Sequence, residues 1–131
     1  MALDDLVYQK VITTIDEVRS DDNKLSPFDF GKYMKENIPG LPKEMREHCY
    51  YVLLELAEDL TDGDRALKIN VLDSLEEILP SMDEDAHDKT YRTITRLLHY
   101  EDDFWTKDFA QRVLRKCDLL MPGKETYKTG K

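Results

Sequence analysis

Residues 115–123, RKCDLLMPG, end a helical pattern on a large apolar residue that is followed by proline and glycine. The same kind of stop occurs earlier, in NIPG at 37–40 and in ILPS at 78–81. Proline cannot continue a helix, because it has no amide donor and its ring clashes with the preceding turn. These prolines lie 41 and 42 residues apart in the chain, at Pro39, Pro80 and Pro122. The spacing predicts a unit of roughly 40 residues that occurs three times.

Apolar residues occupy the same places before each proline. The positions one, five and nine residues before it are apolar in all three stretches: Ile38, Leu79 and Met121; Met34, Leu75 and Cys117; Phe30, Val71 and Val113. Steps of four residues put side chains on one face of a helix. The pattern therefore predicts three helices that bury the same side.

Three- and four-residue apolar steps predict six helices and no strands. The helices are expected at about 2–19, from Pro27 to Pro39, from Pro42 to Leu60, at about 64–79, from Ser81 to the turn YEDD, and from Phe104 to Pro122. The first is expected to bury an apolar stripe made of Leu3, Leu6, Val7, Val11, Ile15 and Val18. The expected N-caps are Ser26 for the second helix, Thr61 or Asp62 for the fourth, and Ser81, with Glu84 three residues later, for the fifth.

The chain is thus predicted to be all-α, with its six helices paired as antiparallel hairpins at 2–40, 41–80 and 81–122. Two helices per roughly 40 residues resemble the HEAT and armadillo-type helical repeats, in period and buried face, over nearly the whole chain. The resemblance implies a short solenoid in which each hairpin rests on the one before it. A compact six-helix bundle is the alternative. Either way we expect one domain at 1–122 and a basic, flexible tail at 123–131.

The composition is that of an acidic globular protein. The 131 residues include 28 acids and 19 bases, for a net charge of −9, and 40% are hydrophobic. No apolar run approaches the roughly 18 residues of a membrane span, and the start, MALDDLVYQK, has acids where a secretion signal has bases. We therefore expect an intracellular protein, in the cytoplasm or the nucleus, without a membrane anchor. Its charge disfavours direct nucleic-acid binding and favours a basic protein partner.

Few residues offer catalytic chemistry. His48 and Cys49 are neighbours on a predicted helix and point about 100° apart, so they cannot form a nucleophile–base pair. Cys49 and Cys117 are expected to be reduced core residues. Glu84 and His87 form one Glu-x-x-His step, whereas carboxylate-bridged di-iron bundles use two. The sequence predicts a non-catalytic protein without metal or cofactor; a metal site around Glu84, His87 and His99 is the enzymatic alternative.

The turns inside the three hairpins are acidic: RSDDNK at 19–24, EDLTDGD at 58–64 and YEDDFW at 100–105. Stacked hairpins would align these turns along one edge. Like charges crowded there repel one another, which indicates a site for a basic partner, although helix capping is an alternative role for each acid. One of the adjacent residues Phe104 and Trp105 is expected to be an exposed anchor. The predicted partner-binding residues are Asp59, Asp62, Asp64, Glu101, Asp102, Asp103, Phe104 and Trp105.

Two functions fit these features. The first is a small adaptor or scaffold that binds a protein partner through the acidic rim and the neighbouring aromatic residues. The second is an inhibitor or immunity-type protein that presents carboxylates to a basic enzyme, one that itself acts on nucleic acid. In a three-unit array the end hairpins are also candidates for packing on a second copy.

Overall fold

The structure, a computed structural model, describes residues 3–20, 25–60 and 64–121. The predicted tail at 123–131 and the predicted caps Thr61 and Asp62 lie outside the described residues. Six helices follow one another, and a 3-10 turn, η2 (Leu79–Ser81), separates the fourth from the fifth: α1 (Leu3–Arg19), α2 (Pro27–Asn37), α3 (Lys43–Asp59), α4 (Arg65–Ile78), α5 (Glu84–Tyr100) and α6 (Phe104–Leu120). The described residues include no strand. The prediction of an all-α protein is confirmed.

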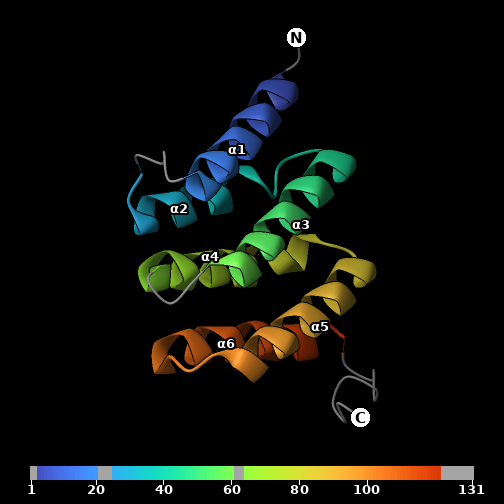
Figure 1. Cartoon of the computed structure of the whole chain (residues 1–131). Helices are drawn as coiled ribbons and strands as arrows, with labels where there is room; N and C mark the ends of the chain where they lie inside the picture. The colour runs from blue at the N-terminus through green and yellow to red at the C-terminus, as the bar shows by residue number, and fades with distance from the viewer. Residues whose placement is uncertain (1–2, 21–24, 61–63, 122–131) are drawn as a thin grey trace.

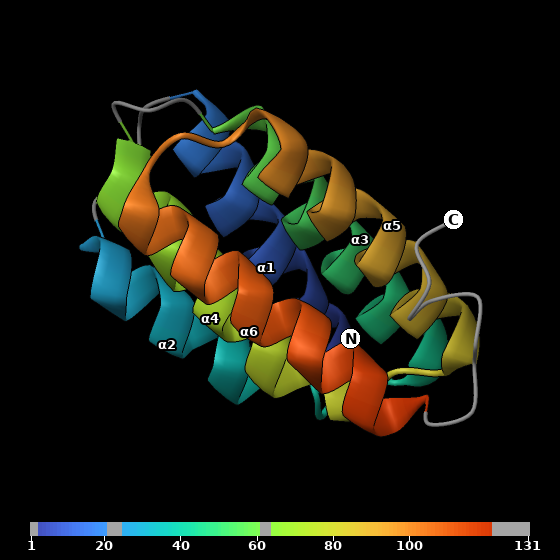
Figure 2. The same ribbon diagram turned by 90° about the horizontal axis from the view of Figure 1, so that it is seen from below.

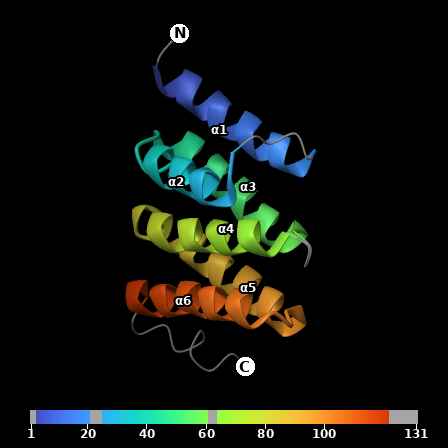
Figure 3. The same ribbon diagram turned by 90° about the vertical axis from the view of Figure 1, so that its left-hand side faces the viewer.

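The helices form two layers, with α1, α3 and α5 in one and α2, α4 and α6 in the other (Figures 1 and 2). In each layer they follow in chain order, so that α2 packs on α4 and α4 on α6, while α1 packs on α3 and α3 on α5. The ends of α1, α3 and α5 and the starts of α2, α4 and α6 lie along one edge, and the connections between hairpins lie along the opposite edge (Figure 3). The resemblance to HEAT-type repeats stays a prediction.

The proline stops act as predicted. The helices α2, α4 and α6 end at Asn37, Ile78 and Leu120, each two residues before its proline in the sequence. The residues directly before Pro39 and Pro80, Ile38 and Leu79, still have helical backbone angles, so the helices end because the proline itself has no amide donor and its ring clashes with the preceding turn. All nine apolar residues predicted to share a buried face are 5% exposed or less.

The predicted cap of α2 is confirmed, because the Ser26 hydroxyl accepts a hydrogen bond from the amide of Asp29 at 3.1 Å. The predicted cap of α5 was wrong. Asp83, not Ser81, caps α5, and its carboxylate accepts from the amide of Ala86 at 3.0 Å. Ser81 belongs to the preceding 3-10 turn and donates its hydroxyl to a carbonyl in the last turn of α4 at 2.6 Å.

The predicted apolar stripe of α1 is only partly buried. Val11, Ile15 and Val18 belong to the core, but Leu3 is 75% exposed and Leu6 is 53% exposed. The first turns of α1 extend past the neighbouring helices at the end of the stack (Figure 1). Periodicity identified the correct face of the helix, but it could not show where the helix runs out of neighbours.

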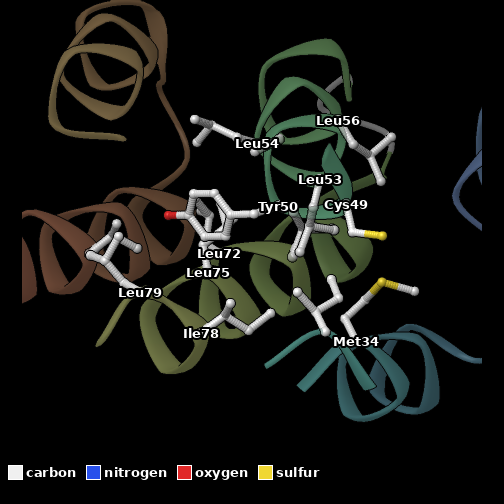
Figure 4. Close-up of a cluster of buried hydrophobic side chains, with 14 of the residues drawn as sticks. Met34, Cys49, Tyr50, Leu53, Leu54, Leu56, Leu72, Leu75, Ile78 and Leu79 are labelled. Atoms are coloured by element: carbon white, nitrogen blue, oxygen red, sulfur yellow. The ribbon is translucent and has the colours of Figure 1, made fainter. Parts of the chain in front are cut away.

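Tyr50 lies at the centre of the core. Its ring extends from α3 over Leu72 and Leu75 of α4 (Figure 4) and is fully buried. Its hydroxyl is 2.7 Å from the Thr90 hydroxyl of α5, so the contact joins the second hairpin to the third. Burial raises the pKa of Tyr50 well above its ordinary value, which keeps the phenol protonated.

Polar side chains connect neighbouring hairpins at a regular sequence distance. In the described residues, six such pairs lie 38 or 40 positions apart: Tyr8–His48, Arg19–Asp59, Tyr50–Thr90, Lys35–Asp73, Glu58–Arg96 and Arg65–Asp103. Separations this similar indicate that successive hairpins pack with nearly the same register, although the Lys68–Glu101 pair joins residues 33 positions apart. The equivalent edges of the three hairpins are therefore held side by side.

Candidate partner-binding surface

The turns within the hairpins bring the predicted binding residues to one edge of the molecule. We call this surface the turn edge and define it as residues 16–20, 25–29, 55–60, 64–68 and 96–107. It contains the ends of α1, α3 and α5 and the starts of α2, α4 and α6, on the right in Figure 3. Asp62 lies outside the described residues.

Exposed apolar and aromatic side chains gather at the turn edge. Eight large side chains of this kind are exposed in the part of the chain that the structure describes. Five of the eight belong to the turn edge: Leu25, Phe28, Tyr100, Phe104 and Trp105. Four of these five are aromatic. The first and third hairpins contribute to the set, and the second does not.

Phe104 and Trp105 are both exposed, at 70% and 55%, where the sequence led us to expect one exposed anchor. They form the first turn of α6, and the buried face of that helix begins only at Thr106. Their rings meet edge to face, with centroids 5.4 Å apart and planes inclined by 79°. This contact holds the two rings together as one exposed aromatic unit.

Several predicted rim acids form ion pairs with the neighbouring hairpin. Asp59 lies 2.6 Å from Arg19 of the first hairpin, and Asp103 lies 3.1 Å from Arg65 of the second. Glu58 binds Arg96 of the third hairpin through two hydrogen bonds of 2.8 and 3.0 Å. These acids, which were predicted to bind a partner protein, therefore also connect one hairpin to the next.

Glu101 is not a surface residue, and the prediction that places it on the rim needs correction. Its side chain is only 4% exposed and lies 2.9 Å from the ammonium of Lys68, which is itself 10% exposed. The other carboxylate oxygen of Glu101 accepts from the amide of Asp103 at 3.1 Å. The turn between α5 and α6 folds its first acid inward against the start of α4.

Asp103 has the capping role that was the alternative for each acid. Its carboxylate accepts from the amide and from the hydroxyl of Thr106, both at 2.9 Å. The amide hydrogen bond from Thr106, supported by the ion pair with Arg65, holds the pKa of Asp103 below its ordinary value. Asp102 and Asp64 are exposed, and Asp64 precedes α4 without a capping hydrogen bond from its side chain.

The turn edge is still acidic after these pairs are counted. Its described residues contain ten acids and five bases, for a net charge of −5. Four of the five bases, Arg19, Arg65, Lys68 and Arg96, form ion pairs with acids of the same edge. Six acids lie outside these four pairs. The edge therefore presents a negative field to an approaching molecule.

A pocket of about 570 Å³ opens at the turn edge between the first and second hairpins. We call it the first-turn pocket. Seven of the ten residues that line it are apolar, namely Val18, Leu25, Pro27, Leu56, Leu60, Ala66 and Leu67, and Arg19, Asp59 and Asp64 add charged and polar atoms to its wall. Sequence reasoning missed this pocket. The only signal was that Leu25 borders an acidic turn without belonging to a predicted buried stripe.

A smaller pocket of about 230 Å³ lies between the second and third hairpins. The Lys68–Glu101 and Arg96–Glu58 pairs line it together with Leu97 and Tyr100. Most of this wall consists of charged groups that are already paired with each other, so few hydrogen-bonding groups remain for a ligand.

The residues considered for catalysis have structural contacts. Burial raises the pKa of Cys49 and of Cys117 to about 12, so both thiols are protonated at neutral pH. The His48 ring is hydrogen-bonded to the Tyr8 hydroxyl of the first hairpin. His87 is buried, and its Nε2 lies 3.0 Å from the carbonyl oxygen of Leu79. Within the described ranges, no group of three or more possible metal ligands comes together.

Comparison of the chain with protein-family models, with curated proteins and with solved structures finds no match. Of the helices in the described residues, none has the length and apolar character needed to cross a membrane.

Proposed function

We propose that this protein is a small, non-catalytic protein–protein interaction module, an adaptor or scaffold, that binds its partner at the turn edge. The observation that carries the proposal is the gathering of five of the eight exposed large side chains at that one edge. Contiguous exposed apolar surface on a folded domain commonly marks a binding site. Tyrosine and tryptophan are enriched among the residues that dominate binding energy.

The proposal includes a HEAT-type arrangement of the three hairpins. Two observations support it: the nine equivalent residues that are all buried, and the six polar pairs that lie 38 or 40 positions apart. Repeats that stack in this way form an extended edge in which each unit adds an equivalent position. Binding residues on the first and third hairpins then act on the same partner.

The ion pairs change the roles proposed for the acids. Asp59 and Asp103 contribute mainly by holding neighbouring hairpins together, whereas Asp102 and Asp64 are exposed enough to meet a partner. An inhibitor that imitates nucleic-acid phosphates needs many carboxylates without intramolecular partners. The pairing of Asp59 and Asp103 therefore argues for the adaptor over the inhibitor.

The test is affinity capture from a native lysate with the immobilised full chain. The double variant Phe104→Ala/Trp105→Ala removes the aromatic unit, and Leu119→Ala is the matched control, because Leu119 is 74% exposed at the other end of the same helix. Circular dichroism verifies that both variants keep their helices. We expect the specific partner to be lost with the double variant and kept with the control, since removal of an aromatic hot spot lowers affinity by roughly 30-fold or more.

Equal recovery of the same proteins by the double variant would contradict the proposal. A salt series separates the two functions. Binding that depends on carboxylates alone weakens steeply as ionic strength rises, because salt screens exposed charges. Binding anchored by the aromatic unit persists at high salt, although the complex forms more slowly.

A further inference from the structure

The first-turn pocket and the aromatic unit are two different chemical surfaces on one edge. The pocket is lined by seven apolar residues from the first and second hairpins, and its volume of about 570 Å³ is typical of pockets that bury a ligand. The aromatic unit belongs to the third hairpin and is exposed, as is Asp102, which precedes it by two residues in the chain. A single linear segment can bind both surfaces only if it has a side chain suited to each, separated by the distance between the pocket and the aromatic unit.

We infer that the turn edge recognises an extended, basic protein segment that inserts one large apolar side chain into the first-turn pocket and lays an arginine or lysine on the aromatic unit four or five residues away. This inference rests on the proposed function and specifies the partner class of the same surface. It adds the pocket as the second anchor point.

The charges at the edge select a basic segment. Acids outnumber bases there by ten to five, so the described residues of the edge carry a net charge of −5 and produce a negative field. A cation near an aromatic face is attracted by the electrons of the ring, and Trp105 provides the strongest such face. Asp102 lies two residues before Phe104 in the same turn, so a base that binds the aromatic unit is also attracted by this exposed carboxylate.

The stacking of the hairpins sets the distance between the two anchor points. Helices that pack side by side are roughly 8–10 Å apart. The pocket lies between the first and second hairpins and the aromatic unit lies on the third, so the two are separated by about one and a half steps, on the order of 15 Å. An extended chain advances about 3.3 Å per residue, so four or five residues span that distance.

The experiment selects binding peptides from a displayed library of randomised dodecapeptides on the immobilised full chain. The affinities of synthetic copies are then measured by fluorescence polarisation. Ala66→Trp fills the pocket from an exposed position of α4, and Gln9→Trp is its matched control on an exposed position of α1. Trp105→Ala removes the principal ring of the aromatic unit. A further set of peptides has three glycines inserted between the apolar residue and the base, which lengthens that spacing by about 10 Å.

We expect enriched peptides with an apolar residue four or five positions from a base. Ala66→Trp, Trp105→Ala and the glycine insertion should each lower their affinity by roughly 10-fold or more, and Gln9→Trp should leave it unchanged. Peptides that lose affinity with Trp105→Ala but not with Ala66→Trp overturn the inference and leave the turn edge as the binding surface. Peptides without excess bases, or no enrichment at all, also overturn it. Peptides that respond to neither variant contradict the proposed function as well.

Discussion

The hydrogen bond between Tyr50 and Thr90 is a direct test of how the second and third hairpins are joined. The Thr90 hydroxyl has one proton, which it donates to the carbonyl of Ala86 at 2.6 Å. Tyr50 must therefore be the donor in its 2.7 Å contact with Thr90. Because Tyr50 is fully buried, no water can replace that acceptor.

The two single substitutions are not equivalent. Tyr50→Phe removes the donor and leaves the Thr90 hydroxyl still bound to Ala86, which costs about 1 kcal/mol of unfolding free energy. Thr90→Val removes the acceptor and leaves a buried phenol proton without a partner, which costs about 2 kcal/mol. In the double variant neither partner remains, so we expect a cost of about 1 kcal/mol, well below the sum of the two single costs.

The assay is urea unfolding followed by circular dichroism, with Tyr51→Phe as the matched control. Tyr51 is the neighbouring tyrosine and is only half-buried, so its substitution should change stability by less than about 0.5 kcal/mol. If the costs of Tyr50→Phe and Thr90→Val add to that of the double variant within about 0.5 kcal/mol, the two hydroxyls are not coupled and the described contact between the hairpins is wrong.

Three further predictions use the same unfolding measurement. Because the pKa of Asp103 is lower in the folded protein than its ordinary value of 3.8, the ionised carboxylate stabilises the fold above pH 3.8, and this contribution is lost as the pH falls through the folded-state pKa. Asp103→Asn should therefore make the unfolding free energy decline less steeply below about pH 4. An unchanged decline would show that this carboxylate is not involved. Glu101→Ala should cost about 3 kcal/mol, because the buried Lys68 ammonium loses its carboxylate and keeps only the Leu60 carbonyl at 3.2 Å, whereas Asp102→Ala at the exposed neighbour should cost less than about 0.5 kcal/mol. Equal costs would refute the assignment of Glu101 as structural and Asp102 as surface. Gly31→Ala places a Cβ 3.1 Å from a backbone oxygen of α4 and should cost about 1 kcal/mol, but Gly40→Ala meets nothing within 4 Å and should be neutral or stabilising; a stabilising Gly31→Ala would mean that α2 and α4 pack less closely than described.

Much of the fold could be predicted because it depends on local chemistry. Spacing of four residues between Met34 and Ile38, or between Leu75 and Leu79, identifies a helical face whatever the helix packs against, and both pairs are buried. The prolines ended their helices where expected for the same reason, since the clash of a proline is with its own preceding turn. Leu3 shows the limit of this reasoning, because burial also requires a neighbouring helix.

The candidate surface could be predicted only in part. One exposed aromatic anchor was predicted because two adjacent bulky residues on a helix cannot both face the core, but the exposure of both Phe104 and Trp105 was not predicted. The first-turn pocket was not visible, because Val18, Leu56 and Leu67 come from three different helices and the space between them has no pattern along the chain. Glu101 and Asp102 are adjacent acids of the same turn, and nothing in their order shows that one is buried and the other exposed.

By itself the sequence determined the six helices, the face that each of them turns to its neighbours and the acidic composition of the turns between them. The helices and their faces follow from residues within about four positions of one another in the chain. Only the tertiary structure decided which acids are bound to bases and which remain at the surface. Three ion pairs of the turn edge, Arg19–Asp59, Glu58–Arg96 and Arg65–Asp103, join residues 38 or 40 positions apart. Each therefore depends on the register between hairpins, and register is set by the packing of the whole core.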